Sequence, residues 1–232
     1  EPGQSLALFL KAALAQQDGD HERAAALYRR VLDLEPGHSG ARYYLANLDF
    51  EEGRWTDAAN GYRRTLAAEY APAPASLLAV VAEHHAGAGE ATSAEEIAAL
   101  AAERPDDPAL RYAQIRLLAL AKDGALRDAK RALELAELLT FQQPSPQALR
   151  TLALAQAAAG DFRTAADTQA QAILMAGGWR PPTMREQMEG ELAAYRDQRL
   201  EGDPWPAGDP LIAPPPFDPT GPFRDYPAAV PY

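Results

Sequence analysis

A glycine that recurs at a nearly constant interval constrains the fold of this chain more than any other feature. Each of these glycines is followed five positions later by an alanine. The glycines, at intervals of 34, 36, 35 and 36 residues, are Gly19, Gly53, Gly89, Gly124 and Gly160. Five consecutive matches at one period indicate that a structural unit of about 35 residues repeats along the chain.

The residue types indicate how one unit folds. A glycine after a helix adopts the positive φ angle that ends the helix. Small side chains on facing surfaces let two helices cross closely. Four of the five residues that stand seven positions before the glycines are small, the set being Ala12, Ala46, Ala82, Leu117 and Ala153. Each unit is therefore predicted to be a pair of antiparallel helices joined by a tight turn.

Helical periodicity and the Pro and Gly breakers predict ten helices, which form five pairs. They span residues 5–17, 21–34, 39–52, 56–69, 74–86, 93–103, 107–121, 125–140, 146–158 and 162–176. An eleventh helix is predicted at residues 182–200, where Met184, Met188 and Tyr195 recur at helical spacing. Because the last unit of a repeat array leaves apolar surface open, this helix is expected to cap it.

Further positions recur in the same register. Tyr28 in the first unit matches Tyr62 in the second, and the turn Gly-Asp-aromatic at 160–162 repeats the Gly-Asp-His at 19–21. The pattern resembles the tetratricopeptide repeat family, in which about 34 residues form two antiparallel helices. The resemblance covers residues 5–178 and implies an all-α fold, a right-handed superhelical solenoid of about five helix pairs. It is strongest in units one, two and five.

We expect two parts, a solenoid with its capping helix at residues 1–200 and an extended tail at residues 201–232. Ten of the last 30 residues are proline, a composition that favours polyproline II and turns over helices. Aromatic residues that interleave with the prolines are predicted anchors of the tail, namely Trp205, Phe217, Phe223, Tyr226 and Tyr232. The tail is expected to dock along its own helices or on a partner, with a mobile acidic tail as the alternative.

Composition excludes several classes of function. A net charge of -11 repels nucleic acid and anionic lipid. No apolar run approaches the roughly 18 to 20 residues that span a bilayer, so no direct membrane insertion is expected. The chain has no cysteine, and its four histidines lack ligand spacing. We therefore expect no catalytic residues, no metal and no cofactor, and we do not expect an enzyme.

The family resemblance implies that the first helices of the units line a concave groove for a peptide or protein segment. The face that it selects consists of Phe9, Gln16, Tyr43, Tyr44, Asn47, Phe50, Glu83, Arg111, Gln114 and Arg150. Asn47 matches an asparagine of chaperone-binding members, but the basic residues that accompany it there are missing. An aromatic groove with few polar groups favours an apolar or proline-rich segment, and the chain's own tail is one.

These features predict a non-enzymatic scaffold for protein–protein interaction, an accessory or adaptor subunit of a larger complex. The alternative is a transient assembly chaperone for a client protein. The expected partner is a protein or a peptide segment. Since the sequence starts at Glu1 without an initiator methionine, a removed signal peptide is one explanation, and a periplasmic or extracellular location is expected, with the cytoplasm as the alternative.

Overall fold

The structure is a computed structural model that describes residues 2–68, 71–177, 182–218 and 220. The described residues form helices, turns and extended segments without a strand, so the predicted all-α class is confirmed. The eleven helices are α1 (Pro2–Gln17), α2 (His21–Leu34), α3 (Ser39–Glu51), α4 (Trp55–Leu66), α5 (Ala75–His85), α6 (Glu90–Glu103), α7 (Pro108–Leu120), α8 (Ala129–Gln142), α9 (Pro146–Ala158), α10 (Phe162–Ala176) and α11 (Pro182–Arg196).

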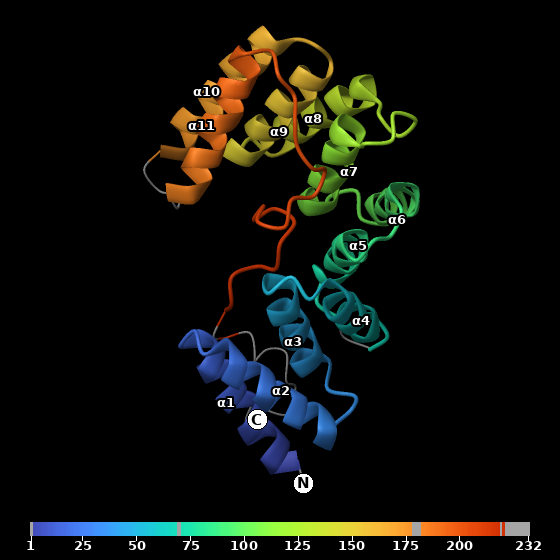
Figure 1. Cartoon of the computed structure of the whole chain (residues 1–232), viewed down its shortest axis with the longest axis vertical. Helices are drawn as coiled ribbons and strands as arrows, with labels where there is room; N and C mark the ends of the chain where they lie inside the picture. Colours follow the sequence, from blue (N-terminus) through green and yellow to red (C-terminus); the bar gives the residue numbers. More distant parts are fainter. Residues whose placement is uncertain (1, 69–70, 178–181, 219, 221–232) are drawn as a thin grey trace. The chain divides into compact units, whose positions relative to one another are not determined.

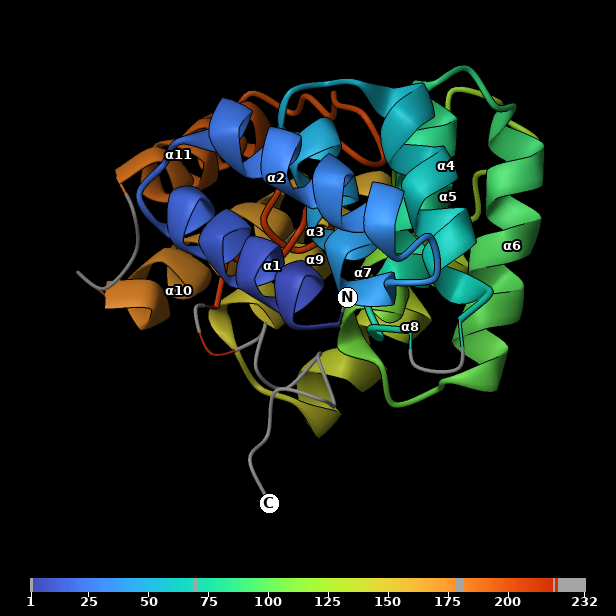
Figure 2. The same ribbon diagram turned by 90° about the horizontal axis from the view of Figure 1, so that it is seen from below.

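The chain divides into two compact units, and the division falls in the turn between α5 and α6. The first unit contains the chain up to Ala88 and the described tail from Ala207 on; the second is Gly89–Pro206. In the first unit each helix from α1 to α5 packs against the next, and Figures 1 and 2 show α1 and α2 side by side. In the second unit the same holds from α6 to α11. Successive packing of this kind is how helical hairpin repeats bury their apolar faces.

Three of the five recurring glycines end the first helix of a pair as predicted. Gly19, Gly53 and Gly160 have φ angles of 78°, 72° and 87°. Each also donates its backbone N–H to the carbonyl three residues earlier, at 3.0 to 3.1 Å. These bonds satisfy carbonyls that a helix end would otherwise leave unpaired. The same local geometry therefore recurs in the first, second and fifth units.

The predicted register of the third unit is wrong by one helix position. Gly87, with φ 106°, ends α5, whereas Gly89 has φ -65° and begins α6. The turn is one residue longer than in the first unit, so α6 starts one position later relative to the glycine. As a result the small buried side chain on α6 is Ser93, and not Ala94.

The fourth unit shows a larger correction. Gly124 is not among the glycines with positive φ, and it lies inside a longer loop between α7 and α8. Asp128 begins α8 by accepting the N–H of Arg131 at 2.9 Å, as Asp20 begins α2. Counting from this cap, Ala132 and not Ala129 is the buried small residue. Gly124 keeps the spacing of about 35 residues because it lies inside the longer loop. The helix α8 begins later, after Asp128, so the glycine no longer marks its start.

The helices α3 and α4 cross closely where Gly61 faces Ala46. A Cβ atom placed on Gly61 would lie 2.7 Å from the Cβ of Ala46. Alanine in a helix interior is favoured over glycine by about 1 kcal/mol, but an overpacked contact costs about 1 to 3 kcal/mol. We expect Gly61→Ala to lower the free energy of unfolding in a urea titration.

Gly190 in α11 is the matched control, because a Cβ there meets nothing within 4 Å. Gly190→Ala is expected to raise the free energy of unfolding by about 0.5 to 1 kcal/mol through helix propensity alone. If both substitutions stabilise the chain equally, the helices of the second pair do not cross closely at Gly61.

Candidate functional site

The candidate site is built on α3, which begins at Ser39 because His38 caps it. The Nδ1 atom of His38 accepts the N–H of Ala41 at 3.1 Å. The imidazole also packs against Phe9 with ring centroids 4.5 Å apart. Burial lowers the pKa of His38, so the ring stays neutral at neutral pH and keeps its lone pair for the cap.

Two adjacent tyrosines of α3 connect the aromatic core to the surface. Tyr44 stacks on Tyr28 with centroids 5.9 Å apart and also contacts Phe9 at 6.1 Å. Tyr43 packs against Tyr62 of α4 at 6.0 Å. Both tyrosines are buried, and both still line a cavity beside α3. Their rings are therefore held in place by packing before any ligand binds.

Asn47, one turn further along α3, supplies a fixed polar group. The hydroxyl of Tyr62 donates to its side-chain carbonyl at 2.9 Å. Burial raises the pKa of Tyr62, so the phenol stays protonated and can donate. Because this bond uses the amide oxygen, the amide nitrogen of Asn47 is the donor that remains for a ligand.

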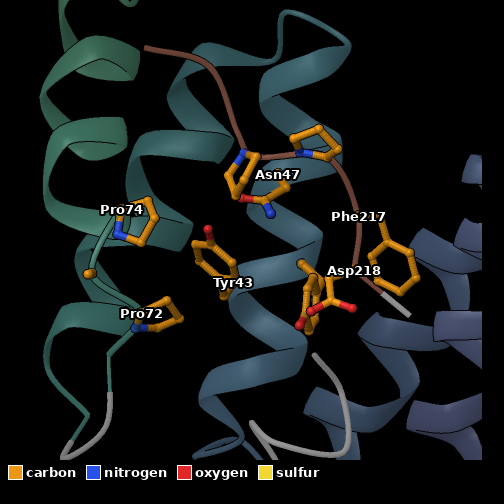
Figure 3. Close-up of a pocket in the computed structure, with 10 residues that line it drawn as sticks. Tyr43, Asn47, Pro72, Pro74, Phe217 and Asp218 are labelled. Carbon is orange, nitrogen blue, oxygen red and sulfur yellow. The ribbon is translucent and has the colours of Figure 1, made fainter. Parts of the chain in front are cut away.

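These side chains line a cavity of about 420 Å³ together with the loop before α5 and the tail. Figure 3 shows Pro72 and Pro74 on one side of Tyr43 and Phe217 on the other. The full lining is Tyr43, Tyr44, Asn47, Pro72, Ala73, Pro74, Pro215, Pro216, Phe217 and Asp218. The ring of Phe217 meets Tyr44 edge-on, with centroids 5.5 Å apart and an interplanar angle of 71°. We call this feature the α3 groove, and its lining is mostly apolar and rich in proline and aromatic carbon.

Other residues of the predicted face in the first unit lie elsewhere. Phe9 and Phe50 are core side chains, with exposed fractions of 0% and 2%. Gln16 is buried and accepts a hydrogen bond from the hydroxyl of Tyr28 at 2.9 Å. Glu83 of α5 binds Arg63 of α4 through two bonds of 2.6 Å. Of the seven predicted residues in this unit, three line the α3 groove, namely Tyr43, Tyr44 and Asn47.

Three residues of the predicted face lie in the second unit. Arg111 and Gln114 are half-buried on α7, and the guanidinium of Arg111 donates to the carbonyl of Pro105 at 2.6 Å. Arg150 of α9 is buried and binds the carboxylate of Glu191 on α11 with bonds of 2.8 and 2.6 Å. Arg150, which was predicted to contact a ligand, therefore holds the capping helix α11 in place.

The beginning of the tail is anchored on α7 in the second unit. Trp205 is fully buried, and its indole N–H donates to the carbonyl of Ala113 at 3.0 Å. Arg116 donates to the carbonyls of Pro204 and Asp203 at 2.7 and 3.2 Å. Arg116 was not among the predicted site residues, because its partners are backbone carbonyls that lie 87 and 88 positions away in the sequence. Three predicted anchors, Phe223, Tyr226 and Tyr232, lie outside the described residues.

Among the helices that the structure describes, none combines the length and the apolar character needed to span a membrane. In the described residues, no group of three or more histidine, aspartate or glutamate side chains is placed to hold a metal ion.

The helix pairs and their glycine turns define a protein built from helical hairpin repeats, with a groove on the first helix of one pair. Residues 15–81 match a sequence model described as Tetratricopeptide repeat. Among solved structures, the crystal structure of YrrB, described as a TPR protein with an unusual peptide-binding site, matches with a TM-score of 0.54. The two chains are 17% identical, and the match covers 79% of this chain and 90% of that chain. No curated protein matches this sequence. The predicted tetratricopeptide resemblance is therefore confirmed.

Proposed function

We propose that this chain is a non-enzymatic interaction scaffold whose α3 groove binds a segment of a partner protein. The observation that carries the proposal is the tail itself, because residues 215–218 line the same cavity as Tyr43, Tyr44 and Asn47, and Phe217 packs edge-on against Tyr44. The tetratricopeptide fold supports it, since repeats of this family hold protein segments. YrrB, which shares the fold, is described as having a peptide-binding site.

The chemistry of the groove supports an extended proline-rich ligand. Proline segments are preset in polyproline II, so little conformational entropy is lost when they bind. They lack internal hydrogen bonds, so their carbonyls are open to a donor such as the amide nitrogen of Asn47. Tyrosine rings present large apolar surface at a small entropic cost, which suits such segments. The net charge of -11 further favours a protein partner over nucleic acid.

In the cell we assign the chain to a larger complex as an accessory or adaptor subunit. The functional division that we propose separates the helices, residues 1–200, from the tail, residues 201–232. The alternative is a transient assembly chaperone. The position of the tail in the groove favours this alternative, because a client would have to displace the tail and would be released when the tail returns. The compartment that we propose is the periplasm or the cell exterior, with the cytoplasm as the alternative, and cell fractionation distinguishes them.

Affinity purification of the tagged full chain from its own cells at low salt, with quantitative mass spectrometry, tests this function. The matched variant is Asn47→Asp, which keeps the acceptor for the Tyr62 hydroxyl but replaces the amide donor with a carboxylate. We expect one partner at near-stoichiometric yield with the native chain and at least tenfold less with the variant. Equal recovery with both chains contradicts a role for the α3 groove, and many weak clients favour the chaperone.

A further inference from the structure

The segment of the tail that lines the α3 groove makes a specific contact there. Phe217 is half-buried and meets Tyr44 edge-on, while Pro215 and Pro216 precede it along the groove. Directly after it, the carboxylate of Asp218 accepts the backbone N–H and the hydroxyl of Thr220 at 2.9 and 2.7 Å. These two bonds lie just beyond the aromatic residue of the segment.

The fit of this segment is incomplete. Pro215, Pro216 and Asp218 are exposed to solvent, so Phe217 is the one of these four that buries much of its side chain. A cavity of about 420 Å³ remains between the tail, α3 and the loop at Pro72 to Pro74. That volume lies in the usual range of ligand sites, roughly 300 to 1,000 Å³. A bulkier segment can therefore fill the groove better than the tail does.

The part of the tail that precedes this segment is held by other contacts. Trp205 is fully buried on α7, and Ile212 is 1% exposed in the first unit. Residues 214–218 can consequently leave the groove while both of these side chains stay buried. A segment tethered this close competes at an effective concentration in the millimolar range, so it weakens any partner that needs the same surface.

We infer that residues 214–218 are an internal competitor of the α3 groove, and that the partner segment carries the same chemistry, consecutive prolines followed by an aromatic residue. The inference rests on the proposed function and deepens it, because it names the class of ligand and a means of regulation. Proline rings pack on Tyr43 and Tyr44, the amide nitrogen of Asn47 donates to a carbonyl of the segment, and the aromatic ring takes the place of Phe217.

Fluorescence anisotropy with a labelled peptide of residues 213–220, Ala-Pro-Pro-Pro-Phe-Asp-Pro-Thr, tests the inference on full-length chains. The native chain is compared with Phe217→Ala, which weakens the internal competitor at a half-buried position outside the helices. We expect the apparent Kd for the peptide to fall at least tenfold in Phe217→Ala. Adding Asn47→Asp to that variant, or replacing the phenylalanine of the peptide with alanine, is expected to raise it again at least tenfold.

The other outcomes separate the two proposals. Equal Kd values for the native chain and Phe217→Ala overturn the internal competition and leave the proposed function standing. Tighter binding of a proline-free apolar peptide than of the tail peptide overturns the assigned ligand class, again without touching the role of the groove. If Phe217→Ala binds neither peptide while its circular dichroism matches that of the native chain, both the inference and the groove are contradicted.

Discussion

Trp205→Ala is expected to lower the free energy of unfolding of the second unit by about 3 to 5 kcal/mol, the usual range for removing a buried tryptophan. The side chain is fully buried against α7, and its indole N–H donates to the carbonyl of Ala113. Its loss leaves a cavity and removes the hydrogen bond to α7, and it loosens the backbone that Arg116 binds at Asp203 and Pro204. Urea denaturation followed by far-UV circular dichroism measures the change.

Two variants serve as controls for that prediction. Trp205→Phe keeps most of the apolar volume and loses the hydrogen bond, so a change of about 1 to 2 kcal/mol is expected. Phe217→Ala removes a half-buried aromatic side chain of the first unit, and its effect on the second unit is expected to be within about 0.5 kcal/mol. A change below 1 kcal/mol for Trp205→Ala would show that the start of the tail contributes little to the stability of α7.

Glu191→Ala is expected to lower the free energy of unfolding by about 2 to 3 kcal/mol, because it breaks the ion pair that holds α11. The side chain of Arg150 is 8% exposed and that of Glu191 is 28% exposed. Removing the carboxylate leaves a buried guanidinium without that partner, and Gln169 loses a hydrogen bond of 2.9 Å. The partial exposure of Glu191 places the expected change below the range for a fully buried pair.

A double variant distinguishes two contributions to this loss of stability. One is the cost of leaving Arg150 without the carboxylate of Glu191, and the other is the net stabilisation from the ion pair. Replacing both residues with apolar ones, Arg150→Met with Glu191→Leu, removes the charge and its need for a partner together. We expect this variant to lie within about 1 kcal/mol of the native chain in the same urea titration. If instead the double variant is less stable than Glu191→Ala, the ion pair itself stabilises the contact between α9 and α11.

The sequence was sufficient where the structural requirement is local. Gly19, Gly53 and Gly160 end helices because a positive φ is needed there, and glycine adopts it without strain. The predicted register was wrong where the loop between two helices is longer. Gly124 keeps the sequence spacing there, but α8 begins later in the chain. The cap residue Asp128 was the better marker, since the start of a helix fixes which side chains become buried.

The candidate site shows the same limit. The family resemblance selected Tyr43, Tyr44 and Asn47, which line one groove, but it also selected Phe9 and Phe50, which are core. The inner face of a first helix serves both purposes, and the sequence period does not separate them. The contact of Arg116 with the carbonyl of Pro204 spans 88 positions and uses a backbone acceptor, which no residue type reveals.

The central claim is that the α3 groove is where a partner binds, and site-specific photo-crosslinking in the native cells tests it most directly. A photoreactive amino acid is placed at Ala73, which is exposed and lines the groove, or at Asn60, an exposed position of α4 that lines a different cavity. We expect the partner that co-purifies with the chain to be cross-linked from Ala73 and not from Asn60. Cross-linking from Asn60 alone, with the partner still bound, would contradict this account.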